Sequence, residues 1–171
     1  FHAGAKLFFD QYNAQSPARR VEIEPLDDGY EPDRCAENTR KLLDKEVFAL
    51  FGYIGTPTSV AALPLATKAE MPFIAPFTGA MSLRQPFNRM ALHLRAPYND
   101  ETELIVKQLT SLGLNRIAVF YQNDSYGKAG LEGTVRALKR RNLEPVAAST
   151  VERNTVDVAK AVADIVPSNA N

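Results

Sequence analysis

The sequence predicts an α/β fold with mainly parallel sheets. Along the whole chain, short runs rich in Val, Ile, Phe and Tyr alternate with segments whose apolar residues recur at helical spacing. The run VFALFGYI (47–54) is apolar throughout, as in a strand that is covered on both faces. Because helices separate the strands, the strands are expected to pair in parallel, with helices on the faces of the sheet.

The first half of the chain contains three predicted helices. Aromatic side chains at helical spacing predict one over 1–13. Proline is favoured as the first residue of a helix, which predicts a second one over 32–43. A third, over 58–70, contains Pro64, which removes an N–H donor and predicts a kink there. Between the first two helices, VEIEPL (21–26) alternates like a half-buried strand.

The second half continues the alternation. Its predicted elements are strands over 90–96, 116–122 and 144–150 and helices over 100–112, 127–141 and 156–166. The first of these helices carries four apolar residues at helical spacing, which we expect to be buried: Leu104, Ile105, Leu109 and Leu112. We expect Asp100 to cap the start of this helix, the alternative being contact with an ammonium group, and Gly113 to end the helix.

Composition argues against several functional classes. Twenty basic and twenty acidic side chains give a net charge of zero, so neither a nucleic-acid footprint nor a polybasic membrane surface is predicted. No apolar run approaches the length of a bilayer span, and direct membrane insertion is not expected. Cys35 is the only cysteine, which excludes a disulfide within the chain, and we expect it to be a small buried residue.

Two loops of small hydroxyl and glycine residues follow neighbouring predicted strands. GTPTS (55–59) follows the strand 47–54, and FTGA (77–80) follows PFIAP (72–76). One helix separates the two strands, so they form a βαβ unit whose strands end at the same edge of the sheet. Parallel sheets place their ligand crevice at that edge, and loops with free N–H groups and short hydroxyls suit a carboxylate.

Two longer segments follow the pattern of a known family. They are LDDGYEPDRCAENTRKLLDKEVFALFGYIGTPTS (26–59) and RIAVFYQNDSYGKAGLEG (116–133). On these segments the chain resembles the type I periplasmic solute-binding proteins, in the leucine/isoleucine/valine-binding branch. The resemblance implies two doubly wound, mainly parallel α/β lobes that are incomplete here. Residues 1–97 would form most of the N-terminal lobe, without its first strand, and 98–171 the start of the second lobe.

The resemblance implies a non-enzymatic receptor for a small molecule. This branch delivers amino acids and related small acids to ABC importers, so the implied partners are such a ligand and an ABC permease, in a periplasmic or extracellular location. No cofactor and no metal are implied. A ligand-sensing domain of a receptor or signalling protein would share this fold, and so would the inducer-binding core of a transcription regulator.

The resemblance also assigns roles within the two hydroxyl loops. Thr56 matches the hydroxyl that holds the ligand carboxylate, at the N-terminus of a helix. Thr58 is either a further contact or, like Ser59, a cap of that helix. The second loop would hold the ligand's amino group. There the family hydroxyl aligns closest to Gly79, one residue past Thr78, so the loop is shifted or the contact differs.

Aromatic residues are expected to enclose the ligand. Phe77 is interpreted either as a wall of the pocket or as part of a simple turn. Tyr126 matches the aromatic residue that covers the ligand from the second lobe; the alternative is a surface tyrosine at a helix start that Asp124 caps. Tyr30 and Gly55 lie near two positions that often form a disulfide in this branch, and neither is a cysteine.

Catalytic machinery is not predicted. The sequence contains no G-x-S-x-G, P-loop, H-E-x-x-H or G-x-G-x-x-G motif. His2 and His93 are the only histidines, and His93 lies in a predicted strand, where we interpret it as a packed residue. The acidic turn at 27–30 lacks the spacing of a calcium loop. An enzyme on this scaffold remains an alternative, because a fold does not by itself determine function.

Overall fold

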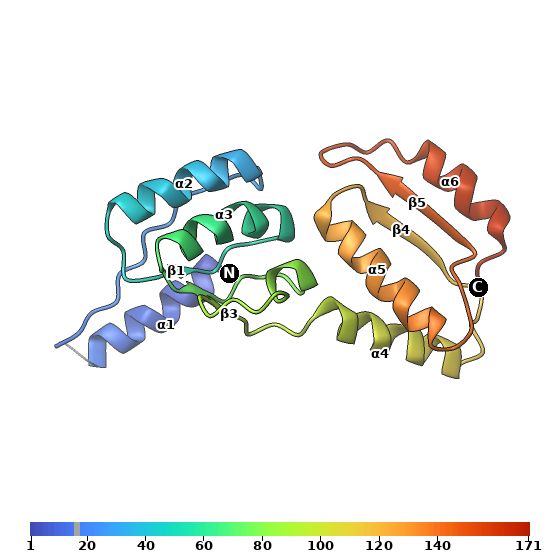
Figure 1. Cartoon of the computed structure of the whole chain (residues 1–171), viewed down its shortest axis with the longest axis horizontal. Helices are drawn as coiled ribbons and strands as arrows, with labels where there is room; N and C mark the ends of the chain where they lie inside the picture. Colours follow the sequence, from blue (N-terminus) through green and yellow to red (C-terminus); the bar gives the residue numbers. More distant parts are fainter. Residues whose placement is uncertain (16–17) are drawn as a thin grey trace.

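The computed structural model describes residues 1–15 and 18–171 and forms two α/β lobes (Figure 1). The first lobe holds a parallel sheet with the strand order β1-β2-β3, and the second holds β4 paired with β5. The α-helices are α1 (His2–Gln15), α2 (Pro32–Asp44), α3 (Thr56–Lys68), α4 (Tyr98–Ser111), α5 (Ser125–Lys139) and α6 (Ala159–Ile165). The strands are β1 (Leu50–Phe51), β2 (Phe73–Ile74), β3 (Ala91–Leu92), β4 (Ala118–Gln122) and β5 (Ala147–Val151).

The predicted α/β class with parallel strands is confirmed. In the first lobe, Phe73 of β2 lies opposite Leu50 on one side and Ala91 on the other. The strands of this lobe are shorter than predicted, because Gly52 and Ala75 adopt left-handed backbone conformations with φ of 70° and 53°. In Figure 1 the chain passes between the lobes once, below the sheets, and enters α4.

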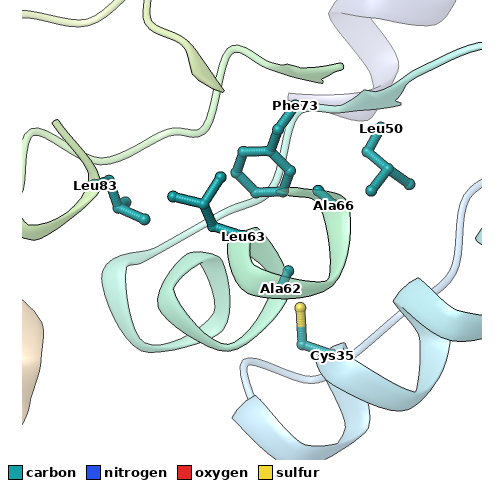
Figure 2. Packing of buried hydrophobic residues seen from close by; sticks show 7 residues of the cluster. All are labelled: Cys35, Leu50, Ala62, Leu63, Ala66, Phe73 and Leu83. Atoms are coloured by element: carbon teal, nitrogen blue, oxygen red, sulfur yellow. The ribbon is translucent and has the colours of Figure 1, made fainter. Parts of the chain in front are cut away.

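The core of the first lobe lies between its sheet and α3 (Figure 2). The ring of Phe73 points from β2 onto α3, beside Leu63 and Ala66, and is fully buried. Burying a phenylalanine side chain stabilises a fold by roughly 1.5–3 kcal/mol. Cys35 reaches Ala62 from α2, which packs on the outer side of α3. Cys35 is buried, as predicted.

The second lobe is built around the packing of α4 on α5 and of β4 on β5. Its buried apolar residues are Val106, Ile117, Ala137 and Leu138. Asp124 caps α5 as predicted, since its carboxylate accepts the N–H of Gly127 at 3.0 Å. Gly127 allows α5 to start against the end of β4, because a Cβ there would collide with the carbonyl oxygen of Gln122. Gly113, with φ of 82°, follows the end of α4 as predicted.

The prediction of a strand over 21–26 is wrong. The segment is held instead by Asn13, whose amide bonds the N–H and the carbonyl of Val21, both at 2.8 Å. A cavity of about 410 Å³ is lined by Ile23 of this segment and by Phe51 of β1. An alternating sequence becomes a strand only with a ladder partner, and no residue within 1–15 or 18–171 supplies one here.

Two predictions about helix α4 are also wrong. Three of the four residues predicted to be buried, Leu104, Ile105 and Leu112, are 67%, 56% and 66% exposed. Val106 lies on the side of α4 that faces α5. Periodicity identifies an apolar stripe but not what covers it. The N-cap of α4 is Pro97, so Asp100 lies in the first turn and does not cap the helix.

Helices α3 and α6 differ from their predicted lengths. Helix α3 begins at Thr56, two residues earlier than predicted, and continues through Pro64 to Lys68. Helix α6 begins at Ala159 and is followed by the 3₁₀ turn η2 (Val166–Ser168). A second 3₁₀ turn, η1 (Met81–Leu83), follows the loop after β2.

Candidate functional site

The two hydroxyl loops lie side by side at the carboxyl edge of the first sheet. An isolated parallel bridge pairs Ile54 with Phe77 and so brings the loop 55–59 next to the loop 77–80. The hydroxyls of Thr56 and Thr78, which come from the two loops, form a hydrogen bond of 2.6 Å. Both side chains are fully buried. The structure therefore brings these two residues together at the start of α3.

Thr58 does not cap helix α3. Its hydroxyl donates back to the carbonyl of Ile54, and the N-cap position is Gly55, which has φ of 93°. Such a bond to the preceding turn occupies the hydroxyl of Thr58 within the backbone. The hydroxyl of Ser59 is buried and has no hydrogen-bond partner among the described residues. The interpretation of Thr58 and Ser59 as helix caps is therefore wrong.

The second loop is packed tightly against the crossover between the lobes. A Cβ added to Gly79 would lie 2.6 Å from the ring of Tyr98 and 2.7 Å from the carbonyl oxygen of Ala96. The carbonyl of Gly79 also accepts the N–H of Tyr98 at 2.7 Å. Only a glycine fits this close approach. At this position the loop therefore offers backbone groups, and no side chain, for contact with a ligand.

Arg84 supports the second loop and was missed in the sequence. One of its guanidinium nitrogens donates to the carbonyl of Thr78 at 3.2 Å and to the carbonyl of Arg95 at 2.8 Å. Burial lowers the pKa of Arg84, although the nearby carboxylates of Asp100 and Glu101 oppose this effect. The residue joins the loop to the crossover through two backbone oxygens. No local motif marks an arginine with this role, so sequence reasoning had no signal for it.

Aromatic side chains from both lobes lie beside the loops. The side chains of Phe77 and Tyr126 are 48% and 47% exposed, so both rings are open to solvent. The ring of Tyr126 lies edge-on to that of Tyr98, with centroids 5.8 Å apart. The guanidinium of Arg95 lies 5.0 Å from the ring centroid of Phe77 and 5.2 Å from that of Tyr98. Such cation–π contacts hold the aromatic residues in place.

Arg95 is in turn fixed by a bidentate ion pair. Its Nε and Nη2 donate to the two carboxylate oxygens of Glu101 at 2.9 and 3.0 Å. The hydrogen bond to Glu101 raises the pKa of Arg95, and the same contact lowers the pKa of Glu101. Both groups are therefore charged at neutral pH, and the ion pair fixes the guanidinium beside the aromatic rings.

Tyr30 joins this group from the acidic turn before α2. Its ring lies against Gly55, where a Cβ would collide with it. Burial is the main cause that raises the pKa of Tyr30 to about 12, and Asp124, Tyr98 and Tyr126 contribute to this increase. The phenol is therefore neutral at physiological pH. It lies near two other tyrosines, Tyr98 and Tyr126. Sequence analysis noted Tyr30 as part of the acidic turn at 27–30 and as lying near a disulfide position of the family, without a role in the site.

The other titratable candidates do not converge. A ring nitrogen of His93 lies 3.0 Å from the carbonyl oxygen of Leu83, and burial lowers the pKa of His93, which agrees with a packed residue. Throughout 1–15 and 18–171, no three side chains of the metal-binding types gather closely enough to hold an ion. The site therefore offers hydroxyls, backbone N–H groups and aromatic walls, a set suited to binding a small polar molecule.

Comparison with known proteins identifies the family. A family model described as a periplasmic binding protein matches residues 1–171. The chain belongs to the periplasmic binding protein family. The resemblance to the type I class that the sequence indicated is confirmed. The family and the fold are those of substrate-binding proteins. A comparison with curated protein sequences finds no match.

Solved structures agree with this family assignment. A possible leucine/isoleucine/valine-binding protein from Rhodopirellula baltica SH 1 is 37% identical over 91% of this chain, with a TM-score of 0.86. A substrate-binding periplasmic protein from Ralstonia solanacearum is 28% identical over 99%, with a TM-score of 0.90. An ABC transporter solute-binding protein from R. palustris, in complex with benzoate, is 16% identical over 91% of this chain, with a TM-score of 0.79, and shows the fold alone.

This periplasmic binding protein chain corresponds to part of those structures. It spans 44%, 49% and 45% of the lengths of the three chains, respectively. None of the helices in the described part of the chain combines the length and the apolar character that a membrane crossing requires.

Proposed function

We propose that the protein is the solute-binding component of an ABC importer and closes over an amino acid or a related small organic acid. One observation carries the proposal: Thr56 and Thr78 meet at the start of α3, where tyrosines of both lobes gather. Residues 1–97 form most of the N-terminal lobe in this proposal, and 98–171 form the start of the second. Closure of the lobes brings the two halves of the site together.

The roles in the site follow from the chemistry of the groups. Thr56 donates its hydroxyl to the ligand carboxylate, and the first N–H groups of α3 add donors and the positive end of the helix dipole. Thr58 contributes its backbone N–H, because its hydroxyl is engaged. The polar or amino end of the ligand meets the loop of Thr78 and Gly79. Phe77 and Tyr126 cover it from the two lobes.

The proposed ligand class includes aromatic as well as aliphatic acids. Support comes from two structural neighbours whose names mention a ligand, namely the possible leucine/isoleucine/valine-binding protein and the benzoate complex. The aromatic walls of the site accept either kind of apolar side chain. The implied partner is an ABC permease, and the implied location is the periplasm or the outside of the cell.

A sensory role on the same fold is the second candidate. Two further neighbours, from Verminephrobacter eiseniae and Rhodopseudomonas palustris, are described as extracellular ligand-binding receptors. A sensor would bind its ligand in the same site but pass the closure to a signalling domain and not to a permease. Reconstituted uptake of a bound ligand with the cognate permease separates the two roles.

A thermal-shift panel on the protein at its natural length tests the binding site. The panel contains L-leucine, L-phenylalanine, L-glutamate, benzoate, an aliphatic carboxylate, an amide and glucose. A ligand at 100 times its Kd should raise the free energy of unfolding by about 2.7 kcal/mol. Binding of one acid, weakened about tenfold or more by Thr56→Val, supports the proposal, because a hydrogen bond to a charged group contributes roughly 1.5–3 kcal/mol.

The matched control is Thr110→Val. The hydroxyl of Thr110 donates to the carbonyl of Val106, one turn back in α4, at 2.8 Å, away from the two loops. This change should lower thermal stability slightly and leave the ligand-induced shift intact. A shift with glucose alone, or equal ligand shifts in both variants, would contradict the carboxylate role of Thr56.

A further inference from the structure

The two lobes meet again on the side opposite the crossover. In Figure 1 the loop after β5 reaches toward the first turn of α2. The guanidinium of Arg153 donates to the carbonyl of Tyr30 at 2.6 Å and to the carboxylate of Glu31 at 2.7 Å. The amide of Asn154 donates to the other oxygen of that carboxylate at 3.0 Å. We name these four residues the interlobe clamp.

The turn on the first-lobe side of the interlobe clamp is built for this contact. Glu31 occupies the N-cap position of α2, yet its carboxylate makes no capping bond and faces the second lobe. Tyr30 has φ of 64°, a left-handed conformation that tyrosine rarely adopts. Its N–H donates to a carboxylate oxygen of Asp28 at 2.8 Å, and Arg34 donates to the carbonyl of Asp28 at 2.7 Å. An unfavourable conformation persists only where surrounding contacts hold it.

The interlobe clamp determines where the ring of Tyr30 lies. Arg153 binds the backbone carbonyl of Tyr30, and the ring of Tyr30 covers Gly55. Gly55 directly precedes the first turn of α3. Asp124, Tyr98 and Tyr126, which belong to the second lobe or to the crossover into it, lie near enough to influence the charge of the phenol. Moving the lobes apart would remove the hold of Arg153 on this turn and separate Tyr30 from Tyr126.

We propose that Arg153 is a positioning residue that holds the lobes closed through the Tyr30–Glu31 turn and thereby makes the Tyr30 ring a wall of the ligand site. The inference rests on the proposed function, since it takes the ligand to bind beside Thr56. The closed arrangement of the lobes is the one that binds the ligand. The apparent Kd is therefore inversely proportional to the fraction of molecules that are closed. Tyr30 contacts the ligand, and Arg153 acts through Tyr30 and Glu31.

The charges of the interlobe clamp make it sensitive to salt. The side chains of Arg153 and Glu31 are 26% and 43% exposed, so dissolved ions screen their attraction. Isolated surface ion pairs contribute little to stability. Here the guanidinium also bonds a backbone oxygen, and Asn154 bonds the same carboxylate, so several contacts act together against opening. Together these contacts can shift the equilibrium between open and closed lobes toward the closed state.

The distance between the lobes tests the proposal without a ligand. Spin labels at Arg40→Cys on α2 and Ala163→Cys on α6 report this distance in the protein at its natural length, while buried Cys35 stays unlabelled. Arg153→Met, and 1 M NaCl on the wild type, should each lengthen the distance. The control is Arg140→Met, since Arg140 pairs with Glu103 within the second lobe. An unchanged distance in Arg153→Met overturns the proposal.

A second measurement follows Tyr30 itself. In protein that contains 3-fluorotyrosine, each of the six tyrosines of this sequence contributes a ¹⁹F signal, and Tyr30→Phe identifies the signal of Tyr30. Arg153→Met should shift and sharpen this signal as the ring leaves the Gly55 loop, and Arg153→Lys should restore part of the effect. An unmoved Tyr30 signal in a folded Arg153→Met protein contradicts the positioning role.

Ligand affinity links the interlobe clamp to the site. With L-leucine and benzoate as probes, Arg153→Met should weaken binding about tenfold, and Tyr30→Leu should weaken it more than Tyr30→Phe does. Unchanged affinity in both Arg153→Met and Tyr30→Leu overturns the proposal. If the wild type binds neither probe nor any other compound of the panel, the proposed function fails, and the distance and ¹⁹F measurements still decide whether Arg153 closes the lobes.

Discussion

At the scale of single residues, the site is held together before any ligand arrives. The hydrogen bond between Thr56 and Thr78 joins the two loops, and Arg84 fixes the second loop to the crossover. Ligand-binding residues need this kind of support, because a mobile donor must lose conformational entropy when the ligand binds. That loss weakens binding. The buried hydroxyl of Ser59, which has no partner in the described part of the chain, lies in the same turn as Thr56.

Cys35 is expected to be chemically inert in the folded protein. Burial is the main cause that raises the pKa of its thiol to about 12, and the nearby carboxylate of Asp28 contributes to this increase. Since the thiolate is the reactive form, a disulfide reagent such as DTNB at pH 8 should react with the native protein far more slowly than with protein unfolded in urea. Equal rates in the two states would show that Cys35 is accessible. The unfolded control should give one thiol per chain.

At the scale of elements, a glycine is required where another segment of backbone packs directly against it and leaves no space for a side chain. Helix α5 contains three glycines, and they differ sharply in their surroundings. Gly127 lies against the end of β4, directly after Tyr126, whereas Gly130 has open space where a side chain would point. The position of Tyr126 in the site therefore depends on how α5 begins beside β4.

Two alanine substitutions in helix α5 should have opposite effects. Gly127→Ala places a Cβ against the carbonyl oxygen of Gln122, which is backbone and cannot move aside, so the free energy of unfolding should fall by about 1–3 kcal/mol. Gly130→Ala meets no atom and should raise it by up to about 1 kcal/mol, because alanine favours the helix. Urea denaturation measures both. A loss of stability in Gly130→Ala would contradict the open environment of this residue.

At the scale of the whole molecule, the lobes are connected by the crossover, by contacts between α3 and α5, and by the interlobe clamp. The crossover and the interlobe clamp differ in kind. The crossover is packed around Gly79 and Tyr98, whereas the interlobe clamp consists of charged and polar groups near solvent. A hinge on one side and a breakable contact on the other are what closure around a ligand requires.

The interlobe clamp should open at acidic pH. The hydrogen bond from Arg153 lowers the pKa of Glu31 below its ordinary value of 4.5, and Asn154 and Arg34 lower it further. A carboxyl with a lowered pKa stabilises the closed state fully above its ordinary value and loses this effect as the pH falls through the lowered one. The distance between the spin labels should therefore stay constant from pH 7 to about 5 and lengthen only in the acid range.

Glu31→Gln is the control for this pH dependence. The amide keeps the size of the side chain but does not titrate, so the acid-dependent lengthening should disappear in this variant. An identical pH profile in wild type and Glu31→Gln would assign the effect to other carboxylates, such as that of Glu101, whose pKa its hydrogen bond from Arg95 also lowers.

The sequence by itself determined the class of the fold and the place of the two loops. Alternating strands and helices, the proline at the start of α2, the glycine after α4 and the Asp124 cap are local signals, and each was read correctly. Thr56 and Thr78 could be paired in advance, because parallel strands that a single helix connects must end at the same edge.

Only the tertiary structure decided which residues meet across the chain. Residues 21–26 have the pattern of a strand but no ladder, and Leu104 has the spacing of a buried residue but no cover. Arg84 and Tyr30 joined the site, and Arg153 reached Glu31 from far along the chain. The physical reason is that periodicity and capping depend on near neighbours, whereas burial, pairing and closure depend on partners that only the folded chain brings together.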